Sequence, residues 1–305
     1  MNGDTTPPSF AAQLTATDVL DGIDLGGRTA VVTGGYSGIG LATTLALVHA
    51  GARVVVPARR PDAAKQVLAS VTGTDVAAVD LSDLTSVRAF AQRFLDAHDT
   101  LDLLIANAGI MACPETRVGP GWEAQFATNH LGHYALTNLL WPALTRSPTA
   151  RVVSVASGRA PAWHIRWDDV HFDRGYDKWE AYTQSKLANI LFARHLDVLG
   201  RERGVRAFSV NPGWVRTPLQ RHLDVDEMVA AGWIDADGTA RPGLFKSVEQ
   251  GAATQVWAAT SGQLDGYGGG YCTDHRIVEG DPADGAEAAR LWMLSAELTG
   301  VDIAR

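Results

Sequence analysis

Short runs of β-branched residues alternate with helical patterns over most of this 305-residue chain, and no other feature constrains its fold as much. The first unit, residues 29–51, has a β-branched segment, a glycine-rich turn, and then leucines and a valine at helical spacing. Strands that alternate with helices of this length form a buried parallel sheet through right-handed crossovers. We therefore expect an α/β fold with a doubly wound, Rossmann-like parallel sheet.

The same unit repeats along the chain without a break. Further strands are expected at 53–56, 76–79, 101–106, 151–155 and 205–210, with an edge-like strand at 269–273. Helices are expected at 61–70, around 87–95, and at 122–144, 182–199, 248–259 and 283–298. This continuous spacing favours a single domain from 28 to 305, preceded by an N-terminal extension, 1–27.

Composition excludes several classes of protein. The chain is 46% hydrophobic and 20% charged, as globular proteins are, and its net charge is −8. Nucleic-acid binding depends on clustered Lys and Arg, which this sequence lacks, so we expect no nucleic-acid partner. The two cysteines form no C-x-x-C pair, and no stretch approaches the roughly 18 apolar residues that a membrane span needs. We expect a cytoplasmic protein without a membrane partner, and a homo-oligomer stays open.

A glycine-rich segment, residues 33–40, lies between the first strand and the first helix. Glycines there let the backbone turn tightly and approach a pyrophosphate, and the helix N-terminus offers free N–H groups. The spacing is G-x-x-x-G-x-G, and such turns also occur for conformational reasons alone. Its place after the first strand favours a dinucleotide site. The contacts expected from this segment are Gly34, Tyr36, Ser37, Gly38, Ile39 and Gly40.

Two arginines follow the second strand, where folds that bind NAD carry a carboxylate. That carboxylate, about 20 residues after the glycines, binds the ribose 2′-OH. Here the strand ends in Ala58-Arg59-Arg60. An arginine binds a 2′-phosphate bidentately, whereas a carboxylate repels it. We expect the cofactor to be NADP and its phosphate to be bound by Arg59, while Arg60 fits a solvated basic turn better.

Tyr182 and Lys186 stand four residues apart in an expected helix, so the phenol and the ammonium share one face. A phenol, whose pKa is about 10, accepts protons poorly at neutral pH unless a nearby cation favours the phenolate. Lys186 would supply that cation. Taken alone, the pair also fits a contact on a helix surface, but its place after the fifth strand argues against that interpretation.

Several motifs follow one another in a fixed order. They are residues 33–40, Asp80-Leu81, Asn107-Ala-Gly109, Asn129-His-Leu-Gly-His133, Ser154-Val-Ala-Ser157, the Tyr182 and Lys186 pair, and Asn211-Pro-Gly-Trp-Val-Arg-Thr217. Together they resemble the short-chain dehydrogenase/reductase family over essentially all of residues 25–301. Segments 129–133 and 184–192 resemble its retinol-dehydrogenase-like branch most.

This resemblance implies a catalytic set. Tyr182 would be the general acid/base, Lys186 would lower its pKa and hold the nicotinamide ribose, and Ser157 would bind the substrate oxygen. Asn129 would support a proton relay through Lys186 and water. Ser154 competes with Ser157, which lies nearer the carboxyl end of its strand. The resemblance also implies cofactor contacts at Asp80, Leu81, Asn107, Gly109, Tyr182, Lys186 and Thr217.

The implied function is an NADP(H)-dependent oxidoreductase that interconverts a carbonyl and an alcohol of a small-molecule substrate by hydride transfer. Residues 28–305 would be a single dinucleotide-binding catalytic domain with a substrate-side insertion near 214–246. Two alternatives stay open. One is a non-catalytic NADP(H)-binding sensor, which would not need the catalytic set. The other is an epimerase or dehydratase on the same fold, which the glycine spacing disfavours.

Tryptophans concentrate in segments that border the substrate cleft in this family. Trp163, Trp167, Trp214 and Trp233 indicate a bulky apolar or aromatic substrate, although plain packing explains any single one equally well. The long segment 219–245 lacks clear periodicity, which suggests either a lid over the substrate or a surface insertion used in subunit contact.

His130 and His133 have the H-x-x-H spacing of some metal ligands. A zinc site needs at least a third protein ligand, and none at suitable spacing accompanies them. The family resemblance explains both as helix packing beside Asn129, so we expect no metal.

Overall fold

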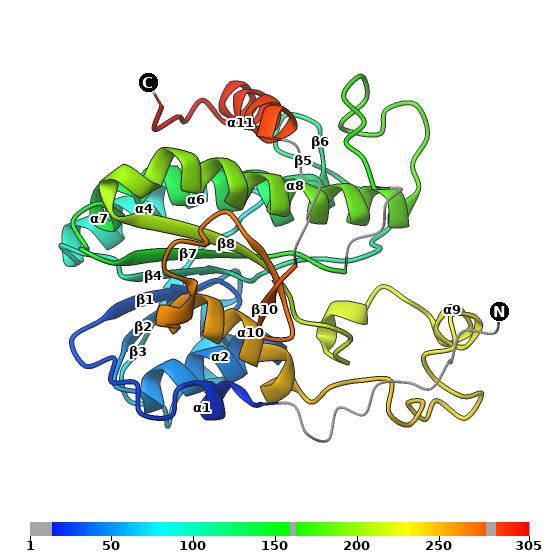
Figure 1. Ribbon diagram of the computed structural model, residues 1–305. Helices are drawn as coiled ribbons and strands as arrows, with labels where there is room; N and C mark the ends of the chain where they lie inside the picture. The colour runs from blue at the N-terminus through cyan, green and yellow to red at the C-terminus, as the bar shows by residue number, and fades with distance from the viewer. Residues whose placement is uncertain (1–13, 159–162, 279–284, 305) are drawn as a thin grey trace.

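A computed structural model describes residues 14–158, 163–278 and 285–304 (Figure 1). Its central sheet is built from β1 (Thr29–Val32), β2 (Arg53–Ala58), β3 (Thr74–Ala78), β4 (Leu103–Ala106), β7 (Ala150–Val155), β8 (Val205–Asn211), β9 (Tyr271–Thr273) and β10 (Arg276–Ile277). The strand order is β10-β9-β8-β7-β4-β1-β2-β3. Neighbouring strands are parallel except β9 and β10, which are antiparallel. The expected doubly wound α/β fold is confirmed.

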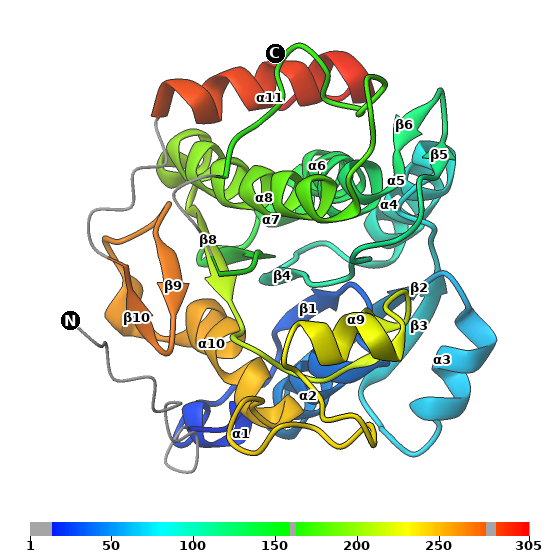
Figure 2. The same ribbon diagram turned by 90° about the vertical axis from the view of Figure 1, so that its right-hand side faces the viewer.

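Helices cover both faces of this sheet. One face carries α4 (Leu84–Ala97), α6 (Gly132–Leu139), α7 (Trp141–Leu144), α8 (Lys178–Gly200) and α11 (Gly285–Thr299). The other carries α1 (Ala16–Val19), α2 (Gly38–His49), α3 (Pro61–Val67) and α10 (Val248–Thr260), of which α3 is labelled in Figure 2. In the described part of the chain, no helix is both long enough and apolar enough to cross a membrane.

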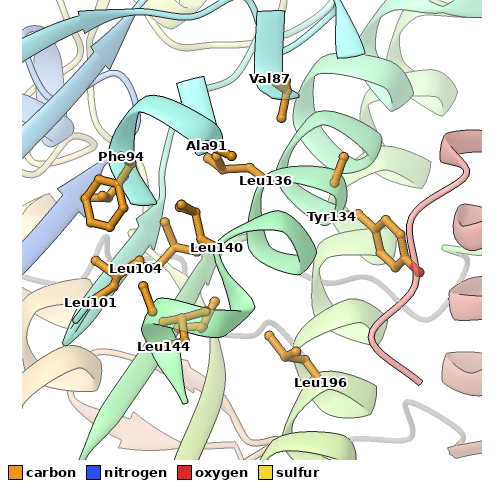
Figure 3. Packing of buried hydrophobic residues seen from close by; sticks show 14 of the residues in the cluster. Val87, Ala91, Phe94, Leu101, Leu104, Tyr134, Leu136, Leu140, Leu144 and Leu196 are labelled. Carbon is orange, nitrogen blue, oxygen red and sulfur yellow. The ribbon is translucent and has the colours of Figure 1, made fainter. Parts of the chain in front are cut away.

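Successive strand residues point to opposite faces of the sheet, so each strand contributes to two apolar layers. Val31 belongs to the layer that contains Leu104 and Phe94, part of which Figure 3 shows. Its neighbour Val32 belongs to the opposite layer, with Leu47. Because both faces are covered, β1 needs no alternation of apolar and polar residues, and its β-branched run follows from that burial.

The expected helix 122–144 is not continuous. Trp122–Glu123 forms the short strand β6, which pairs with β5 (Arg117–Val118) as an antiparallel ribbon. The Glu123 carboxylate accepts hydrogen bonds from the backbone N–H groups of Gln125 and Phe126, so the helix begins only after it, as α5 (Ala124–Phe126). Five residues of π-helix, Ala127–Leu131, then lead into α6.

A second break separates α6 from α7, at Leu140. Pro142 has no backbone N–H, and its ring is tolerated only in the first turn of a helix, so α7 begins just before it. Elsewhere the sequence patterns missed β10 and the short helix α9 (Val225–Ala230). They also began α8 four residues late: Asp177 caps it by accepting from the N–H groups of Trp179 and Glu180.

We expect Gly132→Ala to destabilise the fold. A Cβ at Gly132 would lie 2.9 Å from the carbonyl carbon and the Cβ of Leu81, and nearer still to its oxygen. The backbone must then shift, which costs about 1–3 kcal/mol. Gly262→Ala is the matched control, because a Cβ there meets nothing within 4 Å. Thermal denaturation should show a clearly lower midpoint for Gly132→Ala alone, and equal midpoints for the two variants would contradict this packing.

Candidate active site

The carboxyl ends of the parallel strands border one cavity of about 560 Å³. Figure 2 faces this edge of the sheet, with α9 on the viewer's side. Ligands of open α/β sheets bind where the strand order reverses, which is here between β1 and β4. The residues predicted from the sequence that line this cavity are Gly34, Tyr36, Ser37, Gly38, Ile39, Gly40, Arg59, Asp80, Leu81, Asn107, Gly109, Ser157, Tyr182, Lys186 and Thr217.

The glycine-rich loop places backbone without side chains at the N-terminus of α2. Gly34 and Gly38 have φ values of +67° and +52°, which favour glycine. A Cβ at Gly40 would lie 2.5 Å from Gly34 O and from Asn107 Nδ2, so a side chain there would displace the loop. Ser37 is the N-cap of α2, yet its side chain makes no capping hydrogen bond. The N–H groups of the first turn therefore suit an anionic group in the cavity.

Hydrogen bonds fix the ends of β1 and β4 to each other at this switch point. The backbone N–H groups of Asn107 and Ala108 both donate to Thr33 Oγ1, at 2.9 Å each. The Asn107 side chain donates through Nδ2 to Thr33 O at 2.9 Å. Asn107 thus shapes the turn beneath the glycine loop as well as lining the cavity.

Tyr182 and Lys186 both reach the cavity from α8. Both are largely buried, at 8% and 3% exposure. Lys186 Nζ lies 5.8 Å from the centroid of the Tyr182 ring and donates to Val155 O at 3.0 Å. Ser157, at the end of β7, also lines the cavity, whereas Ser154 is buried in that strand. Ser157 is therefore the serine that a ligand in the cavity can reach.

Burial dominates the ionisation of this pair. It raises the pKa of Tyr182 to about 12, and a hydrogen bond with Ser157 lowers that pKa only in part. Burial also lowers the pKa of Lys186 to about 8. Burial thus dominates the Tyr182 pKa in this structure, in which Lys186 Nζ donates to Val155 O, and the lowering of that pKa expected from Lys186 stays a prediction. At neutral pH Tyr182 is a neutral phenol, which can donate a proton.

Asn129 is fully buried in the π-helical segment, behind Gly109: a Cβ at Gly109 would lie 3.1 Å from Asn129 Oδ1. Its side chain is held on both sides. Oδ1 accepts from Ile110 N at 2.9 Å, and Nδ2 donates to Ile110 O at 3.0 Å and to Ser185 Oγ at 2.9 Å. Of the four predicted catalytic residues, Asn129 therefore supports the wall of the cavity, while the other three line it.

His133 joins Asn129 to the glycine loop. Its Nδ1 is 2.9 Å from Asn129 O, and a carbonyl only accepts, so Nδ1 carries the proton. Burial lowers the pKa of His133 to about 4, so the ring is neutral and Nε2 accepts from Thr33 Oγ1 at 2.8 Å. His130 instead contacts Ser295 Oγ at 2.7 Å. Within the described ranges no group of three His, Cys, Asp or Glu side chains could hold a metal ion.

Five aromatic side chains, here called the aromatic wall, line another part of the cavity: Trp163, Trp179, Trp214, Trp233 and Phe245. Trp233 lies 5.6 Å from Trp214 and 6.1 Å from Trp179 between ring centroids, both edge to face. The sequence analysis missed Trp179, although it precedes Tyr182 by three residues and so shares its helix face.

Trp167 does not belong to this aromatic wall. The Arg290 guanidinium lies over its ring, 4.2 Å from the centroid, and Trp167 packs in a separate apolar cluster with Ile165. Arg60 and Arg221 do line the cavity, although the sequence analysis did not assign them to it.

Comparison with known proteins identifies the family. The model of the short chain dehydrogenases matches residues 28–228. A "Probable oxidoreductase" of Streptomyces lividans is 41% identical over 300 residues, which cover 90% of this chain and 98% of that protein. Retinol dehydrogenase 14 of Mus musculus is 37% identical over 293 residues, which cover 90% of this chain and 86% of that protein.

Among solved structures, a Pseudomonas aeruginosa RhlG/NADP active-site complex matches with a TM-score of 0.63 and 26% identity, over 82% of this chain and 95% of that chain. The protein belongs to the short-chain dehydrogenase family and is one of its oxidoreductases. Within that family it belongs to the retinol-dehydrogenase-like branch. The bare backbone around Gly34 and Gly40 fits the nicotinamide dinucleotide that this family binds.

Proposed function

We propose that this oxidoreductase uses NADP(H) to interconvert a carbonyl and an alcohol, with Tyr182 as general acid/base. The observation that carries the proposal is the shared cavity. Tyr182, Ser157 and Lys186 line the same cavity as the glycine loop and Arg59. A substrate and a dinucleotide bound in this cavity would therefore both lie close to the proposed proton donor.

In this proposal the dinucleotide lies along the carboxyl ends of the strands. The loop at 34–40 would hold its pyrophosphate, Arg59 its 2′-phosphate, and Thr217, which packs against Gly38, its nicotinamide end. The bound nicotinamide supplies a hydride for reduction or accepts one in oxidation. The protein has to orient the substrate and to move the proton.

Proton transfer would involve three side chains. During reduction the Tyr182 O–H gives its proton to the carbonyl oxygen while the carbonyl carbon receives the hydride, which yields the alcohol. The Ser157 hydroxyl donates a hydrogen bond to the same oxygen and fixes its position. Lys186, whose Nζ lies 5.8 Å from the ring centroid, stabilises the phenolate that remains. Oxidation of the alcohol reverses these steps.

The aromatic wall supports a bulky apolar or aromatic substrate. Trp179, Trp214 and Trp233 present large apolar surfaces beside Tyr182. Burial of an apolar substrate against such rings is favourable by roughly 25 cal/mol per Å². A small polar carbonyl compound would gain little of this.

A panel of large aromatic and small aliphatic ketones tests the proposal, with NADPH or NADH consumption followed by absorbance. We expect kcat/KM with NADPH to exceed that with NADH by about tenfold or more, because the bidentate contact of Arg59 with the 2′-phosphate contributes upwards of about 1.4 kcal/mol. Large ketones should react faster than small ones. An equal or better rate with NADH would overturn the assignment of the cofactor.

A further inference from the structure

Three arginines line the cavity near one another. Arg59 and Arg60 directly follow β2, and Arg221 follows the 3₁₀ turn Pro218–Gln220 in the segment after β8. All three line the cavity together with Tyr36. Burial lowers the pKa of Arg221, and the charges of Arg59 and Arg60 lower it further. Arginines that are far apart in the sequence thus line the same cavity, close enough for their charges to interact.

This basic cluster has no acidic partner among the described residues. In the described part of the chain, no Asp or Glu forms an ion pair with Arg59, Arg60 or Arg221. Arg221 Nη1 donates to Pro218 O at 3.1 Å, a bond that does not neutralise its charge. Like charges held together cost free energy, and in a chain of net charge −8 carboxylates are plentiful. The arrangement therefore suits an anion that enters the cleft.

We propose that Arg221 is a second residue that recognises the 2′-phosphate of NADP, together with Arg59. This inference rests on the proposed function and deepens it. Two guanidinium groups that line the same cavity can each bind a phosphate bidentately, and the dianion relieves their mutual repulsion. The pyrophosphate of NADP is a less suitable partner for Arg221, because the backbone N–H groups at the N-terminus of α2 already suit it.

The position of Arg221 in the chain links binding of the 2′-phosphate to the part of the cavity that would hold the substrate. The same segment continues into α9, where Glu227 forms an ion pair with Lys178 at the start of α8, and then into Trp233, which packs on Trp179. Arg221 would thus tie the segment that carries the aromatic wall to the cofactor. A phosphate bound between Arg59 and Arg221 would favour the arrangement in which that wall faces Tyr182.

Binding of adenosine nucleotides by calorimetry tests the inference without turnover. The two probes are 2′,5′-ADP, which carries the 2′-phosphate, and 5′-AMP, which lacks it. Arg221→Ala should raise the Kd of 2′,5′-ADP about tenfold or more, the effect of losing one charge-assisted contact of this kind, and leave that of 5′-AMP unchanged. Arg216→Ala is the matched control, because Arg216 belongs to the same segment but does not line the cavity.

The outcomes separate this inference from the proposed function. If the wild-type protein binds both probes equally, recognition of the 2′-phosphate fails altogether. If the wild-type protein discriminates, Arg59→Ala loses the discrimination and Arg221→Ala keeps it, only the inference is overturned. An equal loss of both probes in Arg221→Ala also overturns it, because Arg221 would then contact a part that the two share. Equal unfolding midpoints of the Arg221→Ala and Arg216→Ala proteins show that both are folded.

Discussion

Tyr182→Phe is expected to lower kcat for ketone reduction by about 10²- to 10⁴-fold, the usual contribution of a positioned general acid. The ring of Tyr182 packs in a small cluster with Met111 and Leu223, and phenylalanine preserves those contacts. Only the O–H group and its hydrogen bond with Ser157 are lost. The affinity for the cofactor should change far less than kcat, because at most one hydrogen bond to the cofactor is lost, and steady-state kinetics with a titration of NADPH fluorescence would measure both quantities.

Tyr267→Phe provides the control for this substitution, since Tyr267 is 60% exposed and lies outside the cavity lining. It should behave as the wild-type protein does. If Tyr182→Phe also keeps the full rate, the proposed acid/base role is wrong. If the wild-type protein binds NADPH but turns over none of the ketones, a cofactor sensor becomes the better interpretation.

The parallel sheet could be predicted because its signals are local. Val54, Val55 and Val56 of β2 are buried on both faces, so the strand appears in the sequence as a continuous β-branched run. The helix at 122–144 was predicted wrongly because apolar periodicity does not show that the Glu123 side chain caps a helix. The signal for α9 was present and overlooked, since Asp224 and Glu227 form a capping box.

The site residues also divide into those with a local sequence signal and those whose position depends on the tertiary fold. Those in compact motifs, such as Gly38, Asn107 and Lys186, line the cavity where the motif order places them. Arg221 could not be found this way, because its proximity to Arg59 depends on the path of an insertion without periodicity. The pKa values of the site residues also depend on the tertiary fold, through burial. Spacing places Lys186 beside Tyr182, but only the packing around them reveals that desolvation controls both pKa values.

Lys186→Met is expected to abolish most of the activity and yet to stabilise the ligand-free protein near neutral pH. Lys186 is buried, with 3% of the residue exposed, and burial lowers its pKa from 10.5 to about 8. A buried charge of this kind costs free energy that methionine, of similar length, does not pay. Without the cation the phenolate of Tyr182 is poorly stabilised, so the rate should fall by about 10²-fold or more.

The pKa values of Lys186 in the folded and unfolded protein determine how the free energy of unfolding changes with pH. Below pH 8 Lys186 is protonated in both the folded and the unfolded protein, and the cost of burial is fully present. Between pH 8 and 10.5 the folded protein binds fewer protons than the unfolded one, so the free energy of unfolding rises with pH. The fall in the Lys186 pKa from 10.5 to about 8 corresponds to roughly 3 kcal/mol.

Urea unfolding of both proteins at a series of pH values measures this effect. The Lys186→Met protein should be the more stable at pH 7 by up to about 3 kcal/mol, and the difference should shrink as the pH rises toward the ordinary lysine pKa of about 10.4. Lys65→Met is the control, because the Lys65 side chain is 63% exposed and should show no such trend. A Lys186→Met protein that is less stable than the wild type at pH 7 would mean that the hydrogen bond to Val155 O and the surrounding dipoles outweigh the cost of burial. The cation would then stabilise the fold as well as the reaction.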